Sequence, residues 1–357
     1  MLVRLISGDR PRSWLLSLVL IAIAAGLAFA PFLFPGTRSL DTAARICIFI
    51  ALVASYDLLL GYTGIVSFAH TMFFGLGAYG VAIALKTMGP SFGAVAVGAG
   101  LGTLAAALLA LLIGLFSLRV RAIFFAMVTL AVASAFELLV SQLSFLTGGE
   151  DGLNYTIPFA LTPGFRLFEE RVLGIAVNGR LLAYYLILLA SAALFLLMLR
   201  VVNSPFGRVL QAVRENAFRA EAVGYRVVYY RTAATVLSAA MAALAGALLA
   251  VWLRYTGPAT TLSLEIMVDI LLMIVIGGMG TMYGAVVGAT VFILAQSYLQ
   301  TLMKLASEAT AAVPLLPNLL HPDRWLLWLG LLFILSVYFF PSGIVGRLRD
   351  RGQTPRV

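Results

Sequence analysis

Residues 181–200 read LLAYYLILLASAALFLLMLR. This stretch carries no charged side chain before Arg200, and it contains neither glycine nor proline. A helix rises 1.5 Å per residue, so about 20 apolar residues are enough to cross a hydrocarbon core of roughly 30 Å. The sequence therefore predicts a membrane-spanning helix at 181–200.

Apolar stretches of similar length recur from Trp14 to Phe340, and the composition agrees with them. Of the 357 residues, 62% are hydrophobic and 11% are charged, whereas a soluble domain has about 25% charged residues. We predict an all-α polytopic membrane protein with a single transmembrane domain over residues 1–357. Its ten expected spans lie at about 14–34, 42–60, 65–85, 92–116, 122–147, 181–200, 232–255, 261–280, 284–305 and 324–341.

The first apolar run allows two interpretations. Arg4, Arg10 and Arg12 precede it, and it ends in Ala28-Phe29-Ala30, which resembles a signal-peptide cleavage site. The run is long for the apolar region of a signal peptide, and Pro31 follows at once. We interpret it as a first span that is retained.

The basic residues predict the orientation, because cytoplasmic loops of membrane proteins are enriched in lysine and arginine. With the N-terminus inside, both termini are cytoplasmic and two long loops, about 148–180 and 306–323, face outward. This distribution explains the net charge of +9 without nucleic acid as a partner. Fifteen of the 24 basic residues then fall on the cytoplasmic side: Arg4, Arg10, Arg12, Arg119, Arg121, Arg200, Arg208, Arg214, Arg219, Arg226, Arg231, Arg347, Arg349, Arg351 and Arg356.

The sequence gives no support to an enzyme. A phosphate-binding P-loop needs a lysine directly after a glycine, but the two lysines, Lys86 and Lys304, follow leucine and methionine. With Cys47 as the single cysteine and His70 and His321 as the two histidines, CxxC and HExxH metal sites are absent. We expect no catalytic residue, no metal site and no cofactor in this chain.

Four acidic residues fall inside predicted spans: Asp57, Glu137, Glu265 and Asp269. A charged acid at the bilayer centre costs about 2.5–3.5 kcal/mol, so each is expected to face protein or water. Glu265 and Asp269 are four residues apart and share a helix face. We expect an ion pair with Arg45 or Arg254 there, and the alternative is a proton relay.

Two tight, glycine-rich junctions separate neighbouring spans, and both are predicted near the cytoplasmic side. Glycines permit close approach of helix backbones, and interrupted helices also mark transport sites. His70 follows the first junction, where it either contacts a substrate or packs as a hydrogen-bonded histidine. The residues expected in the translocation path or in helix packing are Gly61, Tyr62, Gly64, His70, Gly277, Gly278, Gly280 and Gly284, with Gly280, Gly284 and Gly288 as a stripe on one helix face.

The longest cytoplasmic loop, about 201–231, predicts a helix that lies outside the membrane. Ser204 suits an N-cap, Pro205 suits the first helical position, and Gly224 suits the C-terminal stop of a helix over roughly 205–223. Glu215 and Arg219 have the spacing of an intrahelical ion pair. Small faces for docking another protein are offered by Ala212, Ala217, Ala220 and Ala222, while the alternative is a basic helix resting on anionic lipid.

Several of these segments together resemble the permeases of branched-chain amino-acid ABC importers, and most closely the M-type subunit. The resemblance covers about residues 40–346. The matching stretches are GYTGIVSFAH at 61–70, FFGLGAY at 73–79, SPFGR at 204–208, RENA at 214–217, AEAVGY at 220–225, GGMGT at 277–281, YG at 283–284, VGA at 287–289 and FPSGIVG at 340–346.

The resemblance implies an inner-membrane permease that moves amino acids with ATP bound and hydrolysed by other subunits. It implies a second, related permease subunit, two cytoplasmic ATP-binding subunits and an extracytoplasmic substrate-binding protein, all around a lipid bilayer. Phe218 stands where the general permease motif has glutamate, so coupling is assigned to the loop as a whole. The residues assigned to ATPase coupling are Arg214, Glu215, Asn216, Ala217, Ala220, Glu221 and Gly224.

Alternative functions remain open at this point. Similar permeases serve urea, short amides and aromatic acids. A proton-coupled secondary transporter would use the acids within the spans, and a scaffold protein would transport nothing.

Overall fold

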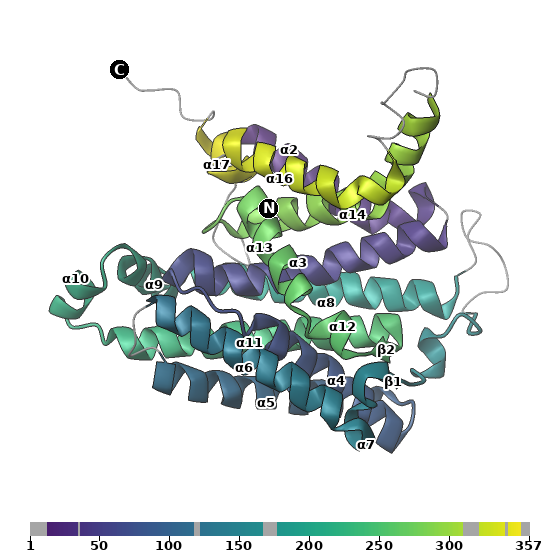
Figure 1. The fold of residues 1–357 in the computed structure, drawn as a ribbon, viewed down its shortest axis with the longest axis horizontal. Coiled ribbons are helices and arrows are strands. Elements are labelled where there is room, and N and C mark those ends of the chain that lie inside the picture. Colours follow the sequence, from purple (N-terminus) through teal and green to yellow (C-terminus); the bar gives the residue numbers. More distant parts are fainter. Residues whose placement is uncertain are drawn as a thin grey trace.

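The chain folds as a bundle of long helices that run roughly parallel to one axis, horizontal in Figure 1. The computed structural model describes residues 13–34, 36–117, 122–166, 177–309, 321–339 and 342–350. Parts of both predicted outward loops, 167–176 and 310–320, lie outside the described residues. So do the basic residues at 1–12, 118–121 and 351–357.

Nine described segments are long and apolar enough to cross a membrane. Eight are single helices and the ninth is a helix pair that covers 258–277. They are α2 (Trp14–Leu33), α3 (Thr37–Thr63), α4 (His70–Met88), α5 (Phe92–Ser117), α6 (Ala122–Gln142), α8 (Gly179–Val202), α11 (Val227–Leu253), α12 with α13 (Pro258–Thr261 and Leu264–Gly277) and α14 (Met282–Ala309). The prediction of an all-α polytopic membrane protein is confirmed.

The tenth predicted span, 324–341, is represented by α16 (Trp325–Phe339). Its 15 residues extend about 22 Å, which is shorter than a hydrocarbon core of roughly 30 Å. Residues 340 and 341 lie outside the described residues, and α17 (Gly343–Asp350) follows them.

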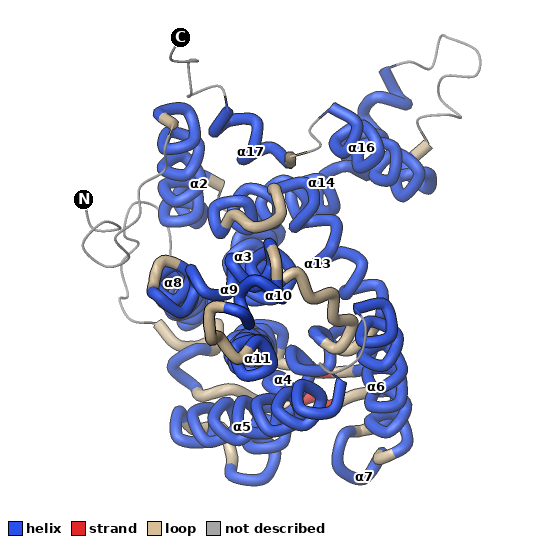
Figure 2. Tube along the Cα trace, turned by 90° about the vertical axis from the view of Figure 1, so that its left-hand side faces the viewer, coloured by secondary structure: helices blue, strands red, loops and turns tan. Residues whose placement is uncertain are grey.

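Helix α3 is the centre of the bundle. Most of its residues are buried, and it packs against α8, α11 and α14, whereas α2 lies at the edge with few of its residues buried. Figure 2 shows the helices nearly end on, with α3 and α11 in the middle. On the outside, α5 and α6 present large apolar side chains, as expected of surfaces that face lipid. These include Leu101, Leu104, Leu108, Ile123, Met127 and Leu138.

Small residues allow α4, α5 and α11 to pack with their backbones nearly in contact. A side chain at Gly77 would overlap the backbone of Ala243 in α11, and one at Gly98 would lie 2.5 Å from the Gly80 carbonyl oxygen. Helix packing in lipid relies on such close approach, because apolar side chains gain little there by leaving the lipid. These glycines therefore fix the core of the bundle.

The two ends of the bundle carry different structures. At one end lie α9 (Pro205–Glu215) and α10 (Ala217–Ala222), on the left in Figure 1. At the other end lie α7 (Ser144–Thr147), η1 (Gly149–Asp151), η2 (Phe159–Leu161) and a two-stranded antiparallel sheet of β1 (Leu153–Asn154) and β2 (Tyr255–Thr256). We call these the α10 end and the strand end.

The predicted ion pair at Glu265 or Asp269 is wrong. Glu265 is exposed and has no basic partner among the described residues, while Asp269 accepts a long hydrogen bond of 3.5 Å from the Gln296 amide. The ion pair at the strand end instead joins Arg180 of α8 to Asp41 of α3, at 2.7 Å. Helical spacing identified the shared face of the two acids, but not the direction in which that face points.

Candidate functional site

Four motifs that are far apart in the sequence meet at the α10 end. They are the junction after α3, the helix pair α9–α10, the turn between α13 and α14, and the start of α17. Both glycine junctions lie at this end of the bundle, since Gly61 and Gly280 are in backbone contact, and their predicted cytoplasmic position stays a prediction.

The first junction ends α3 in a left-handed turn. Gly64 has φ 72°, and the amides of Gly64 and Ile65 donate to the carbonyls of Leu60 and Leu59. This is the pattern of a Schellman cap, in which glycine avoids the steric cost of positive φ. The chain then runs without helix to His70, so this junction is a break between two helices, and the expected span at 65–85 begins later than predicted.

Asp57 connects the first junction to the second. Its side chain is 1% exposed, and its Oδ1 accepts a hydrogen bond of 2.9 Å from the amide of Gly280. Gly280 has φ 77°, and a Cβ at Gly61 would lie 2.5 Å from the Gly280 nitrogen. Glycine at both positions therefore allows the two junctions to touch.

Arg214 of α9 reaches over this contact. Its Nη1 donates a hydrogen bond to the carbonyl oxygen of Gly61. A Cβ at Gly280 would lie 2.7 Å from the same nitrogen, and one at Gly64 would lie 3.3 Å from Arg214 Cγ. The charge of Arg214 also attracts the Asp57 carboxylate. One side chain of the α9–α10 pair is thus joined to two turns between spanning helices.

The second junction is packed as closely as the first. Gly278 has φ 116°, and a Cβ there would lie 2.9 Å from the carbonyl oxygen of Ser342, just before α17. A Cβ at Gly284 would lie 2.6 Å from the Gly278 carbonyl oxygen, and one at Gly277 would overlap the backbone of Gly284. The predicted stripe needs correction, because Gly280 precedes α14 in a turn, and only Gly284 and Gly288 pack on α13.

The helix predicted over 205–223 is two helices. Ser204 caps α9 and Pro205 is its first residue, as predicted, but α9 ends at Glu215. Asn216 adopts an extended conformation, and its Oδ1 accepts from the Arg219 amide at 2.9 Å, which caps α10. The break abolishes the helical spacing between Glu215 and Arg219, and no ion pair forms between these two described residues. Gly224 follows α10 with φ 102°, consistent with its predicted role as a stop.

The docking face predicted from small residues is partly wrong. Ala220 is buried with Val213 and Val227 beneath α10, so it holds the helix pair together and offers no surface. Ala217 is partly buried against the same cluster, whereas Asn216 and Glu221 are exposed.

The sequence analysis did not identify Phe218 as an exposed side chain of the α9–α10 pair. Phe218 is 82% exposed, and Val223 nearby is 74% exposed. These two side chains make this segment a candidate contact for a partner protein or for the lipid surface. The available signal was an aromatic residue at the motif position where related permeases have glutamate.

Tyr62 and His70, the other two residues predicted for the translocation path or helix packing, are both buried inside the bundle. Tyr62 is 5% exposed near the end of α3. His70 is fully buried at the start of α4, where its Nε2 lies 2.8 Å from Ser55 Oγ and its ring is 4.9 Å from that of Tyr56. The interpretation of His70 as a hydrogen-bonded packing histidine agrees with this environment.

Comparison with known proteins assigns this arrangement to a family. The model of the branched-chain amino acid transport system permease component matches residues 39–337. The chain belongs to this family. Among curated relatives, the high-affinity branched-chain amino acid transport system permease proteins LivM of Salmonella typhimurium and Escherichia coli are each 25% identical to the permease, over 355 and 354 residues. Each alignment covers 96% of the permease and 76% of the relative.

A probable branched-chain amino acid transport permease protein LivM of Methanocaldococcus jannaschii is 26% identical over 163 residues, or 45% of each chain. No solved structure matches the permease. The M-type resemblance found in the motifs is therefore supported over almost the full chain, and the protein is a multi-pass membrane permease component.

Proposed function

We propose that this permease is the M-type transmembrane subunit of an ABC importer that carries branched-chain amino acids inward across the inner membrane. The observation that carries the proposal is the Arg214 contact, which joins the α9–α10 pair to the turns after α3 and before α14. ATPase subunits outside the membrane can move the spanning helices only through a segment that they can reach and that contacts several of these helices directly. The substrate class rests on the names of the relatives.

In this proposal the α10 end is cytoplasmic, both termini are cytoplasmic, and the strand end faces outward. The partners are a second related permease, two ATP-binding subunits that supply the ATPase site, and an extracytoplasmic binding protein. The arginine distribution supports this orientation.

Coupling follows from how α9 is held. Gly207, Leu210 and Val213 are buried along one side of α9, which packs against α3, α8 and α11. A side chain at Gly207 would overlap the backbone of Val202, so the end of α8 and the start of α9 are locked together. A displacement of the helix pair by an ATPase subunit therefore acts on the spanning helices through packing and through Arg214.

A proton-coupled mechanism has less support. Asp57 is bound by a backbone amide and attracted by Arg214, and Asp269 is bound by Gln296. We infer structural roles for the two acids from these contacts.

The docking surface of the proposal is tested at Phe218. Replacing an anchor of an interface typically costs 2 kcal/mol or more, which is roughly a thirtyfold loss of affinity. We expect Phe218→Ala to weaken association with the ATPase subunits by about that factor and to lower transport in proteoliposomes, while insertion and yield stay normal. Tyr229→Ala is the matched control, since Tyr229 is also an exposed aromatic residue at this end, at 63%, but lies on α11.

The proposal is wrong if Phe218→Ala keeps full transport and full ATPase association, as Tyr229→Ala is expected to do. The α9–α10 pair would then be a segment that rests on the lipid surface and has no coupling role.

A further inference from the structure

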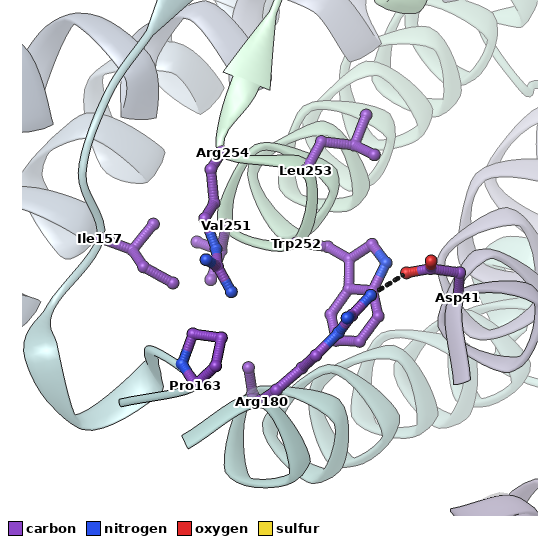
Figure 3. Close-up of a pocket in the computed structure, with 9 residues that line it drawn as sticks. Asp41, Ile157, Pro163, Arg180, Val251, Trp252, Leu253 and Arg254 are labelled. Atoms are coloured by element: carbon purple, nitrogen blue, oxygen red, sulfur yellow. Dashed lines mark hydrogen bonds and ion pairs between the residues drawn. The ribbon is translucent and has the colours of Figure 1, made fainter. Parts of the chain in front are cut away.

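A cavity of about 330 Å³ opens at the strand end, opposite the Arg214 contact. It lies between the start of α8, the end of α11 and the segment around η2, as Figure 3 shows. Its walls combine charged and apolar side chains: Asp41, Arg180, Arg254, Ile157, Val251 and Trp252. The volume is at the lower end of the range of small-molecule pockets, which is about 300–1,000 Å³.

The two arginines of this cavity differ in their partners. Arg180 pairs with Asp41 at 2.7 Å, and its guanidinium lies 5.5 Å from the centre of the Trp252 ring. Arg254 has no hydrogen-bond acceptor and no ion pair for its guanidinium among the described residues, and Figure 3 shows this group pointing into the cavity. One cationic group is therefore available to a ligand.

The surroundings of Arg254 favour an anion. Partial burial lowers the pKa of Arg254, and repulsion from the Arg180 charge lowers it further. Both effects disfavour the charged form, and an anion between the two guanidinium groups would offset both.

The backbone holds Arg254 in place at a steric cost. Arg254 has φ 58° and is the one residue other than glycine with positive φ in the described part of the chain. Its carbonyl accepts from the Tyr155 amide at 3.4 Å, and the Tyr155 hydroxyl donates to the Ala250 carbonyl at 2.9 Å. The strand pairing of Leu153 with Thr256 then fixes the chain beyond Arg254. Strained backbone that is held by several neighbouring contacts is typical of functional sites.

We propose that this cavity binds a small carboxylate with an apolar side chain, with Arg254 as the carboxylate-binding residue. The inference rests on the proposed function, since it assigns an outward-facing subsite for the substrate of the importer. A guanidinium presents a planar pair of donors that matches a carboxylate. Ile157, Val251 and Trp252 supply the apolar wall for the side chain, and Arg180, paired with Asp41, lies across the cavity from Arg254.

Direct binding tests the subsite on the full chain in lipid nanodiscs, without ATPase subunits. The probes are radiolabelled leucine and radiolabelled isocaproate, which is leucine without its amino group, with isohexanol as a competitor that lacks the carboxylate. We expect both labelled compounds to bind and isohexanol to compete poorly. Arg254→Asn should weaken binding of both tenfold or more, and asparagine tolerates positive φ, so this variant is expected to fold.

Two further variants separate charge from geometry. Arg254→Lys keeps the charge but loses the planar pair of donors, so we expect an intermediate affinity. Arg166→Gln is the matched control, because Arg166 is an exposed arginine near the strand end outside the cavity, and its loss should leave binding unchanged.

The outcomes distinguish this inference from the proposed function. Unchanged binding in Arg254→Asn, or no binding of either labelled compound to the wild-type chain, overturns the subsite even when the assembled importer transports normally. Binding that depends on Arg254, together with no ATP-driven transport by the assembled complex, overturns the proposed function alone. If Arg254→Asn instead reduces only the capture of an acidic binding protein, the cavity is a protein-docking site and the small-ligand proposal is wrong.

Discussion

At the scale of single residues, the Arg214 contact depends on the absence of a side chain at glycine positions. Gly280 combines positive φ with immediate neighbours, Arg214 Nη1 and the Gly61 carbonyl oxygen. Gly224 also has positive φ, but nothing would lie within 4 Å of a Cβ there. The two glycines therefore separate the cost of backbone strain from the cost of disturbing the contact.

We expect Gly280→Ala to lose most ATP-driven transport and Gly224→Ala to keep most of it. Each variant should lose roughly 1–2 kcal/mol from left-handed backbone strain, and Gly280→Ala should melt at a lower temperature than Gly224→Ala because its Cβ also displaces Arg214. Transport in proteoliposomes and melting of the purified chain are the two measurements. Equal transport by both variants would mean that the Arg214 contact contributes nothing beyond packing.

The glycines of the site could be predicted from the sequence, and the orientation of the coupling residues could not. Glycine clusters between apolar spans indicate tight turns, because the need for positive φ is local. Whether Ala220 faces inward or outward depends on the break at Asn216 and on contacts with Val213 and Val227. Those contacts come from packing, and the helical spacing assumed for a continuous helix gave the wrong face.

At the scale of elements, α10 is the part of the coupling segment that depends most on its cap. It has six residues, which is too short to be stable alone, and the Asn216 side chain satisfies one of its free amides. The buried Ala220 is its main apolar contact with the bundle.

Asn216→Ala should therefore loosen α10 by about 1 kcal/mol, the usual value of an N-cap, without affecting the spans. Hydrogen exchange at residues 217–222 should become faster, whereas α9 stays protected and the yield of the protein is normal. Asn216→Asp keeps a capping oxygen and is the matched control. Unchanged exchange in Asn216→Ala would show that packing alone holds α10.

The long spanning helices could be predicted because the thickness of the bilayer sets their length. The positions at which these helices break could not be predicted. Helices α3, α8 and α11 agree with apolar stretches of the expected size. The break between α12 and α13, which also lies within an apolar stretch, has no strong sequence signal apart from Ser263, which caps α13. The non-helical residues before His70 are held by tertiary contacts, including the Phe68 amide that donates to Thr129 Oγ1 of α6 at 3.0 Å.

At the scale of the whole molecule, the orientation can be tested at the two ends of the bundle. The strand end and the α10 end are opposite each other in Figure 1. A reporter that is active only outside the cytoplasm should work when inserted near Asp151 or Glu308, and it should be inactive near Asn216 or after Arg349. The physical reason is the preference of lysine and arginine for the cytoplasmic side. The reverse activity pattern would show that the orientation is opposite to the proposed one, with the cavity at Arg254 facing the cytoplasm.

The continuity of helix α11 connects the two ends of the bundle mechanically. It runs without interruption from Val227, beside α10, to Leu253, next to Arg254, a length of about 40 Å. A continuous helix of this length behaves as a stiff rod, and its two tips cannot be displaced along its axis independently. A ligand that prefers one position of the rod at the strand end changes the affinity of any partner that also prefers one position at the α10 end, and linkage requires the reverse effect to have the same factor.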